Sequence, residues 1–438
     1  MGSASGRDHG QTHWLGRWFG QYSMTLNVEI LGPWLHNRGD ELGVWAVARQ
    51  LEGRAKLGAS SNLGLDAFPT QPPLYKIKWP SGLGDLLSRL GRADLREVAR
   101  LSRDNAMLAA MPERALDGRG WIAGSKIDLM VDCSGYGYGD MWSLERTRVR
   151  AEYARRLKQH GAKIAVLPQA FGPFEKPEIR HACRRFFAHC DLIFARDAQS
   201  RAHLLSLGVD ESVVEIAPDV THLVEGVTPA DAQAWERRIA VVPNTRMLDS
   251  GAQSARGAYR EFLESSIRFI RSRDLEPVLI VHEDNDLPLA RELASSPGCD
   301  CTMFHESALV LKGMLGAARG VIASRYHACV SALSQGVPTL ATSWSHKYEA
   351  LFADYGCAEL VISPDAPQEL QHASLARLTS LDARAELSAW LRVRAATQKE
   401  LAAAMWQKII ALAGGAQASG FREPAVPSRR AGTIAAES

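Results

Sequence analysis

A run of four residues, Ser324-Arg325-Tyr326-His327, has the composition of an anion-binding site with acid–base capacity. The run follows a short apolar segment that is typical of a strand, and it opens a segment that is typical of a helix. The first turn of a helix has unpaired N–H groups and a partial positive charge. Arg325 can bind a phosphate or carboxylate through two hydrogen bonds, and His327 titrates near neutral pH. A lone histidine is usually structural, but this combination favours a functional site.

Two further cations follow predicted strands. Arg196 ends the segment DLIFAR (191–196), where it can bind an anion in a cleft or pair with a local carboxylate. The next residue, Asp197, is suited to cap the helix that follows. Lys347 comes after the apolar run PTLATSW and opens another helix, so it is either a further cleft cation or a solvated surface lysine. We favour anion binding for Arg196 and leave both roles open for Lys347.

The turn Asn37-Arg38-Gly39-Asp40 follows the predicted strand NVEIL (27–31). Gly39 permits close approach of the backbone to a ligand, and Asp40 is suited to the N-cap of the next helix. Asn37 and Asp40 are therefore candidates for binding an acceptor or lining a cleft. The alternative is an ordinary turn without a site, because this residue pattern is common in such turns.

Four other polar residues stand directly after predicted strands. Ser134 opens the run S-G-Y-G-Y-G, whose spacing differs from G-x-G-x-x-G and is a weak dinucleotide signature. Gln169 precedes a Gly-Pro turn and either faces a ligand or makes a structural hydrogen bond. His282 and Glu283 begin a polar cluster that can bind hydroxyl groups or form a capped turn. No H-E-x-x-H pattern follows His282, so we predict no metal site and no bound cofactor.

These candidates are positioned by apolar runs of strand length that alternate with helical segments along most of the chain. Such alternation predicts parallel sheets covered by helices on both faces, with ligands at the carboxyl ends of the strands. The fold class is α/β, with two doubly wound Rossmann-like domains facing a cleft. The predicted organisation is an N-terminal extension (1–22), a first domain (23–225), a linker (226–236), a second domain (237–414) and a disordered tail (415–438).

The chain has 438 residues and a net charge of +2, which gives no reason to expect a nucleic-acid partner. Its seven cysteines, an odd number in mostly apolar or helical contexts, indicate a reduced cytoplasmic protein. No apolar run approaches the length of a membrane span. Trp14, Trp18 and Phe19 in the N-terminal extension either pack on the first domain or touch a membrane surface.

Taken in order, the motifs resemble those of the polysaccharide pyruvyl transferase family over about residues 25–360. The matching segments are N-R-G-D (37–40), S-G-Y-G (134–137), P-Q-A-F-G-P (168–173), A-R-D-A-Q-S (195–200), A-P-D (217–219), S-R-Y-H-A (324–328), G-V-P (336–338) and Lys347. The chain departs from the family pattern at Cys133-Ser134, where a glycine-rich run is usual, and at Tyr326, where leucine is commoner. Either departure can change the acceptor or donor pocket.

The resemblance implies a fold like that of GT-B glycosyltransferases, with phosphoenolpyruvate as the donor. It implies a sugar, an oligosaccharide or a lipid-linked glycan as acceptor, at the inner face of the membrane if the acceptor is lipid-linked. By the same resemblance Arg196, Arg325 and His327 match the donor-binding positions, which makes Ser324 and Tyr326 their neighbours in the donor site. The product would be a pyruvate ketal in a cell-surface polysaccharide such as an exopolysaccharide, with release of phosphate. His327 and Arg325 are the catalytic candidates.

Two other interpretations stay open from the sequence. A nucleotide-sugar-dependent GT-B glycosyltransferase also needs cations for phosphates, and it usually needs an acidic residue for the donor ribose, a role that Glu349 could take. A catalytically silent member of the family could bind glycans or assemble a biosynthetic complex. The intact Arg196, Arg325 and His327 argue against this second alternative.

Overall fold

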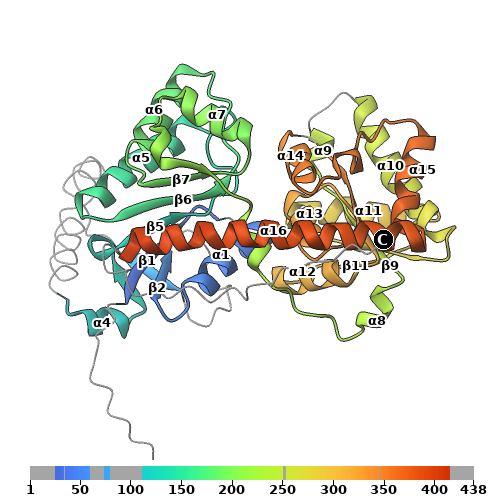
Figure 1. Cartoon of the computed structure of the whole chain (residues 1–438), viewed down its shortest axis with the longest axis horizontal. Coiled ribbons are helices and arrows are strands. Elements are labelled where there is room, and N and C mark those ends of the chain that lie inside the picture. Colours follow the sequence, from blue (N-terminus) through green and yellow to red (C-terminus); the bar gives the residue numbers. More distant parts are fainter. Residues whose placement is uncertain are drawn as a thin grey trace, which may run out of the picture.

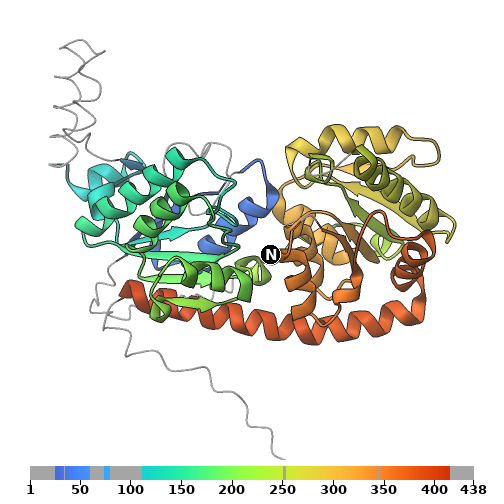
Figure 2. The same cartoon turned by 90° about the horizontal axis from the view of Figure 1, so that it is seen from above.

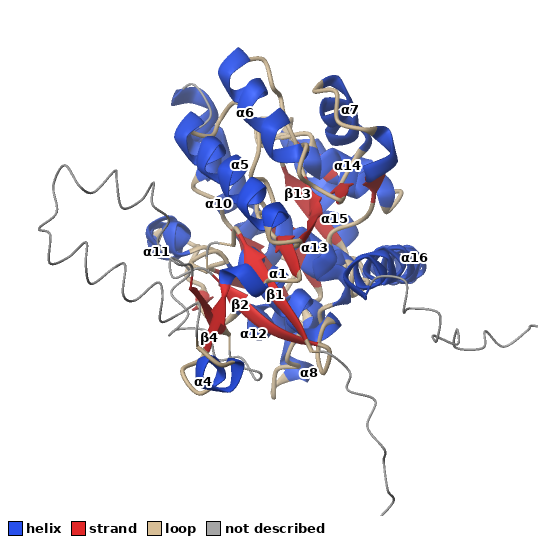
Figure 3. Cartoon of the chain, turned by 90° about the vertical axis from the view of Figure 1, so that its left-hand side faces the viewer, coloured by secondary structure: helices blue, strands red, loops and turns tan. Residues whose placement is uncertain are grey.

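The computed structural model describes residues 25–33, 35–59, 74–78, 111–249, 253–343 and 345–414. The predicted N-terminal extension (1–22) and tail (415–438) lie outside these residues. The described chain forms two parallel sheets that stand side by side, each accompanied by its own helices (Figures 1 and 2). Strands lie inside and helices outside (Figure 3). The predicted α/β class with two doubly wound units is confirmed.

The first sheet has the strand order β4-β3-β2-β1-β5-β6-β7-β8, and neighbouring strands are parallel throughout. Its strands are β1 (Leu26–Leu31), β2 (Ala55–Ala59), β3 (Tyr75–Lys78), β4 (Trp121–Ala123), β5 (Leu129–Asp132), β6 (Lys163–Gln169), β7 (Leu192–Ala195) and β8 (Val214–Ile216). Its helices are α1 (Arg38–Gln50), α4 (Glu113–Asp117), α5 (Leu144–Gln159), α6 (Pro177–Phe187) and α7 (Ala198–Ser206).

The second sheet has the strand order β11-β10-β9-β12-β13-β14 and is also parallel. Its strands are β9 (Arg238–Val242), β10 (Glu276–Ile280), β11 (Thr302–Phe304), β12 (Gly320–Ala323), β13 (Thr339–Thr342) and β14 (Val361–Ile362). Its helices are α8 (Ala232–Trp235), α9 (Arg246–Asp249), α10 (Gln253–Arg271), α11 (Leu287–Ser295), α12 (Ala308–Ala317), α13 (Tyr326–Leu333), α14 (Lys347–Asp354) and α15 (Gln368–Thr379).

Both sheets reverse their direction of winding at one point. In the first sheet the chain moves outward from β1 to β4 and then returns to place β5 beside β1. In the second it moves outward from β9 to β11 and returns to place β12 beside β9. Open α/β sheets bind ligands at the carboxyl ends of strands beside such switch points. The segments after β1, β5, β9 and β12 are therefore the places where this fold can build a site.

Strands β2 to β4 were not predicted from the sequence, because each is short and none has a long apolar run. They form the outer edge of the first sheet beyond β1, and several of their side chains are only partly buried. An edge strand of this kind lacks the continuous apolar run that marks the central strands. The central strands β1, β5, β6 and β7 lie where the sequence predicted them.

The last helix, α16 (Leu381–Gly414), runs along both halves of the molecule (Figure 1). Its first half contributes Leu387 and Leu391 to the core of the second sheet, whereas Trp406 and Ile409 join the core of the first. The end of the predicted second domain thus packs on the first. Among the described helices, α16 included, none is long and apolar enough to cross a membrane.

The predicted linker (226–236) packs against the second sheet. The Val227 N–H donates a hydrogen bond to the Leu309 carbonyl oxygen at 2.9 Å. Trp235, on the short helix α8, is fully buried in the core of the second half. This segment therefore contacts the second half at both of its ends, through Val227 and Trp235.

Glu29, in the middle of β1, is fully buried, and its carboxylate oxygens lie 2.8 and 2.6 Å from the Tyr153 hydroxyl that donates to them. Burial raises the pKa of Glu29 from 4.5 to about 7, although the Tyr153 hydrogen bond opposes the shift. When folding raises the pKa of a carboxyl, the protein becomes less stable as the pH rises from the pKa of the unfolded state through the pKa of the folded state. From about pH 5 to about pH 8, ionisation of Glu29 lowers the free energy of unfolding by on the order of 3 kcal/mol.

We therefore expect Glu29→Gln to raise the melting temperature at about pH 8 and to change it little at about pH 5. Thermal melts of the two proteins across this pH range measure the effect. Melting curves that shift by the same amount at every pH would contradict the expectation.

Candidate active site

A cavity of about 610 Å³ lies at the carboxyl ends of the strands, between the two sheets. It is lined by Asn37, Asp40, Ser134, Gly135, Tyr136, Met141, Trp142, Arg196, Asn244, Arg246, His282, Glu283, Asn285, Arg325, Tyr326, His327, Lys347 and Tyr348. All of the predicted site residues except Ser324 and Gln169 are in this set. The cavity combines segments that follow β1 and β5 with segments that follow β9 and β12, as the switch points require.

The turn after β1 joins the two halves at one side of the cavity. Asn37 is the N-cap of α1, and its side-chain oxygen accepts a hydrogen bond from the Gly39 N–H at 2.8 Å. The predicted N-cap role of Asp40 was therefore wrong, because Asp40 lies within the first turn, where it lines the cavity. The Asn37 side chain also donates to Glu283 at 3.3 Å, and the two residues form an antiparallel bridge.

Further contacts strengthen this connection. The Arg38 N–H donates to the carbonyl oxygen of His282 at 3.0 Å. The carboxylate of Asp284 is contacted by Arg38 at 3.3 Å, by His36 at 2.9 Å and by His305 at 2.9 Å. Burial, with the nearby positive charges of His327, Arg325 and Arg38, holds the pKa of His282 well below its usual value. His282 is therefore an uncharged residue in the wall of the cavity.

Asp219 stands behind the cavity and connects its two halves. Its carboxylate accepts from Arg196 at 2.9 Å and from the Thr221 N–H and hydroxyl at 3.0 and 2.7 Å, and it lies 3.4 Å from Nε2 of His327. Burial opposes ionisation, but His327, Arg196 and Thr221 hold the pKa of Asp219 well below its usual value. The sequence placed Asp219 in the A-P-D motif without a role.

Arg196 both pairs with a carboxylate and lines the cavity. Its guanidinium lies 4.0 Å from the centre of the Tyr326 ring, a cation–π contact, and its side chain is nearly buried. The structure shows the pairing with a carboxylate and places the guanidinium in the cavity wall, and anion binding by Arg196 stays a prediction. Asp197 caps α7 as predicted, accepting from the Ser200 N–H at 2.6 Å.

Arg325 is held by two carboxylates from the loop after β10. Its Nε and one terminal nitrogen donate to Asp286 at 2.7 and 2.6 Å, and the other terminal nitrogen donates to Glu283. These contacts use three of the five N–H groups of a guanidinium, so two remain for a ligand. Arg325 lines the cavity beside His327, and Gly39 lies so close that a Cβ there would be 2.0 Å from Nδ1 of His327. A side chain on residue 39 would clash with the imidazole of His327, so this position requires glycine.

Ser324 and Gln169 lie behind the cavity and support its walls. The Ser324 hydroxyl is fully buried, 2.8 Å from the Tyr259 hydroxyl and 2.7 Å from that of Thr342. The Gln169 side-chain oxygen accepts from the Gly137 N–H at 2.9 Å, which fixes the glycine-rich loop after β5. The structure therefore favours the structural alternative for Gln169. Ser134 lines the cavity and donates to Asp132 at 2.5 Å.

Lys347, at the start of α14, points into the cavity among three aromatic rings. Its ammonium lies 5.4 Å from the ring centre of Tyr326, 5.6 Å from that of Tyr348 and 5.9 Å from that of Tyr136. Desolvation lowers the pKa of Lys347 to about 7, and the charges of Arg196 and Arg325 act in the same direction. Lys347 therefore lies in the cavity wall, where its protonation depends on its surroundings, and it is not a solvated surface lysine.

Several cavity residues were missed from the sequence. Asn244 follows β9 and donates to the Ser324 carbonyl oxygen at 2.7 Å, so the rule that ligands bind at strand ends could have found it. Met141 and Trp142 lie several residues after β5, where strand-end spacing gives no signal. By contrast Glu349, the residue considered for a donor ribose, is exposed on α14 and does not line the described cavity.

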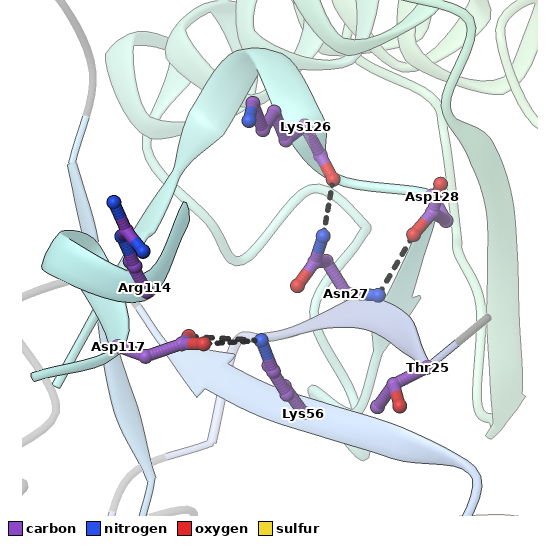
Figure 4. Close-up of a pocket in the computed structure, with 7 residues that line it drawn as sticks. All are labelled: Thr25, Asn27, Lys56, Arg114, Asp117, Lys126 and Asp128. Atoms are coloured by element: carbon purple, nitrogen blue, oxygen red, sulfur yellow. Dashed lines mark hydrogen bonds and ion pairs between the residues drawn. The ribbon is translucent and has the colours of Figure 1, made fainter. Parts of the chain in front are cut away.

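A second pocket, of about 600 Å³, lies at the amino ends of strands of the first sheet, and its lining residues are shown in Figure 4. It surrounds the beginnings of β1 and β2, away from the carboxyl ends of the strands. Lys56 contacts Asp117 at 2.8 Å, and Asn27 is held by the Asp128 carboxylate at 2.8 Å. Two of its charged groups, Lys56 and Asp117, thus pair with each other, and the candidate active site remains the cavity between the sheets.

The paired sheets and the cavity between them are those of the GT-B fold. Anabaena HepE in complex with UDP-glucose has a TM-score of 0.55 at 12% identity, over 88% of this chain and 98% of that chain. A Listeria monocytogenes protein assigned as a UDP-N-acetylglucosamine 2-epimerase has a TM-score of 0.54 at 13% identity, over 88% of this chain and 96% of that chain. Identities this low establish the fold alone.

The sequence profile of the polysaccharide pyruvyl transferases matches residues 37–346, and the chain belongs to this family. The predicted resemblance is confirmed, and with it the assignment to an enzyme family that implies a polysaccharide acceptor. The match begins at Asn37, in the turn that joins the two halves, and ends one residue before Lys347. A comparison with curated protein sequences finds no match.

Proposed function

We propose that this protein transfers the pyruvyl group of phosphoenolpyruvate onto two hydroxyls of one sugar, forming a pyruvate ketal and releasing phosphate. The observation that carries the proposal is the set of basic side chains around one cavity, Arg196, Arg325, His327 and Lys347, in a chain of this family. Phosphoenolpyruvate carries a phosphate and a carboxylate on three carbons, so it needs several cations within a short distance. Charge-assisted hydrogen bonds to such groups contribute roughly 1.5–3 kcal/mol each.

Arg325 and the first turn of α13 would bind one anionic group of the donor, and Arg196 with Lys347 the other. Arg325 is already oriented by Asp286 and Glu283, and Arg196 by Asp219. Fixed cations of this kind need little reorganisation when phosphate leaves, which is how preorganised sites stabilise developing charge.

The reaction needs one proton donor and two proton acceptors. A proton adds to the methylene carbon of the donor, and the first sugar hydroxyl bonds to the cationic carbon that bears the phosphate, losing its proton. The second hydroxyl then bonds to the same carbon as the phosphate leaves, so one phosphate forms for each ketal and no water is consumed. His327 is suited to the proton transfers, because Asp219 lies 3.4 Å from its Nε2 and can stabilise the imidazolium.

The acceptor we propose is a sugar of a polysaccharide or exopolysaccharide, or of its oligosaccharide or lipid-linked precursor. Phosphoenolpyruvate is a cytoplasmic metabolite, so the reaction would take place in the cytoplasm or at the inner face of the membrane. Asn37, Asp40 and Ser134, which line the first half of the cavity, would bind its hydroxyls. Glu283 would orient the acceptor only indirectly, because its carboxylate is engaged with Arg325 and Asn37.

Lys347 provides a test of donor binding that needs no acceptor. Because its pKa is about 7 in the free protein, an anionic donor beside it should raise that pKa. At about pH 8 the free amine is mostly neutral, so binding should take up a proton, whereas at about pH 6 it is already charged. We expect calorimetry in buffers of different ionisation enthalpy to show more proton uptake by the wild type than by Lys347→Met at about pH 8. Equal uptake by the two proteins would contradict this role.

The proposal as a whole is tested by product analysis. The full-length protein is incubated with isotope-labelled phosphoenolpyruvate and a panel of bacterial oligosaccharides and simple glycosides. The expected product has gained the mass of pyruvate minus water with all labelled carbons, and an equal amount of phosphate is released. Phosphate release without labelled sugar, or transfer of a sugar from UDP-glucose to the same panel, would overturn the proposal.

A further inference from the structure

The wall of the cavity contributed by the first half carries apolar side chains as well as hydroxyl-binding groups. Tyr136, Met141 and Trp142, here called the aromatic rim, line the cavity within the loop between β5 and α5. The cations Arg325 and Lys347 come from the second half. The cavity therefore has an anion-binding side and a side suited to a ligand with both apolar and hydroxyl surfaces.

The loop that carries the rim is fixed by hydrogen bonds to the loop after β6. The Tyr136 hydroxyl donates to the Gly172 carbonyl oxygen at 2.6 Å. The Asp140 carboxylate accepts from the N–H groups of Glu175 and Lys176 at 2.7 and 3.1 Å, and its own N–H donates to the Pro173 carbonyl at 3.0 Å. A loop held in this way presents its side chains in one arrangement, which favours binding of a shaped ligand.

The ring of Trp142 is held from one side. The Arg146 guanidinium lies 4.0 Å from the centre of the indole ring, and the Trp142 N–H of the backbone donates to the Gly139 carbonyl at 3.1 Å. Beside it the Met141 side chain is 55% exposed. An exposed methionine next to an indole at the edge of a polar cavity contributes little to the core and is accessible to a ligand.

We propose that the aromatic rim binds a pyranose ring of the acceptor, with the apolar face of the sugar against Trp142 and its hydroxyls toward Asn37 and Asp40. A pyranose has a face of C–H groups and an edge of hydroxyls, so it matches an aromatic ring flanked by polar groups in one cavity. This inference rests on the proposed function for the identity of the donor, which would lie against the cations of the other half. The rim would then determine which sugar presents its pair of hydroxyls to the donor carbon.

The test measures carbohydrate binding and donor binding separately. Fluorescently labelled full-length protein is applied to an array of bacterial glycans, and thermal melts with phosphoenolpyruvate are recorded for the same proteins. We expect Trp142→Ala to weaken binding to the preferred glycan by about tenfold or more, and Trp142→Phe to retain most of it. Trp390→Ala, which changes a half-exposed tryptophan on α16, is the matched control and should bind as the wild type does.

The rim proposal is overturned if the wild type binds no glycan on the array or if Trp142→Ala binds as well as the wild type. Failure of the proposed function gives a different pattern, in which phosphoenolpyruvate leaves every melting temperature unchanged while glycan binding still depends on Trp142. A normal response of Trp142→Ala to phosphoenolpyruvate shows that the variant is folded and that its donor side is intact.

Discussion

Replacing His327 with alanine is expected to lower kcat for ketal formation by about two to four orders of magnitude, the usual contribution of general acid–base catalysis. The imidazole lines the cavity between Arg325 and Gly39, and its Nε2 lies 3.4 Å from the Asp219 carboxylate. Among the described residues that line the cavity, His327 is the histidine whose ring lies beside a carboxylate, which makes it the candidate for proton transfer. Phosphate release with labelled phosphoenolpyruvate and the acceptor from the panel measures the loss.

The control for this prediction is His160→Ala, which changes an exposed histidine at the end of α5 and should keep full activity. The melting temperature of the His327 variant should stay close to that of the wild type, because the imidazole is partly exposed and accounts for little of the core. His327→Gln, which keeps most of the volume, should be as inactive as the alanine variant. Full turnover by either His327 variant would remove this residue from the mechanism.

The second large effect is expected for Asp219→Asn. The change keeps the size of the side chain and its contacts with Thr221, but it removes the charge that holds Arg196 and His327 together. We expect kcat to fall by about a hundredfold while KM for phosphoenolpyruvate does not rise, because a negative charge beside the donor site is lost. We also expect the protein to lose roughly 3 kcal/mol of stability, since a nearly buried guanidinium is left without its partner.

Thr221→Val is the matched control for this variant. It removes the hydroxyl that donates to Asp219 at 2.7 Å and leaves the charge in place. Its effect on kcat should stay within about tenfold, in line with the loss of one neutral hydrogen bond. If Asp219→Asn instead raised KM and left kcat unchanged, Asp219 would act in donor binding and not in positioning His327.

The basic residues of the cavity could be predicted from the sequence because their signals are local. Arg196 follows β7 directly, Arg325 and Lys347 lie in the short segments after β12 and β13, and the carboxyl ends of parallel strands meet at one edge. Asp197 could be assigned as a cap for the same reason, since capping depends on the three residues that follow. The alternation of strands and helices likewise predicts two doubly wound sheets.

The partners of these residues could not be predicted, because they come from distant segments. Asn37 meets Glu283 across 246 positions in the chain, and Arg325 meets Asp286 across 39. Nor does the position of a residue at the end of a strand indicate in which direction its side chain points. For this reason Ser324 and Gln169 were predicted to line the site, although they lie behind the cavity. Tertiary packing decides both which partners a residue has and in which direction its side chain points. A single sequence contains no direct signal for either property.

Use of phosphoenolpyruvate as the donor is tested by a thermal-shift titration of the full-length protein with phosphoenolpyruvate, with UDP-glucose and UDP-N-acetylglucosamine in parallel. A ligand that binds the folded state raises the melting temperature as its concentration rises. Pyruvyl transfer from phosphoenolpyruvate predicts a shift with this ligand that is lost in Arg325→Lys, which keeps a charge for Asp286 but loses the guanidinium fork. A shift with the UDP-sugars and none with phosphoenolpyruvate would contradict it and would indicate glycosyl transfer.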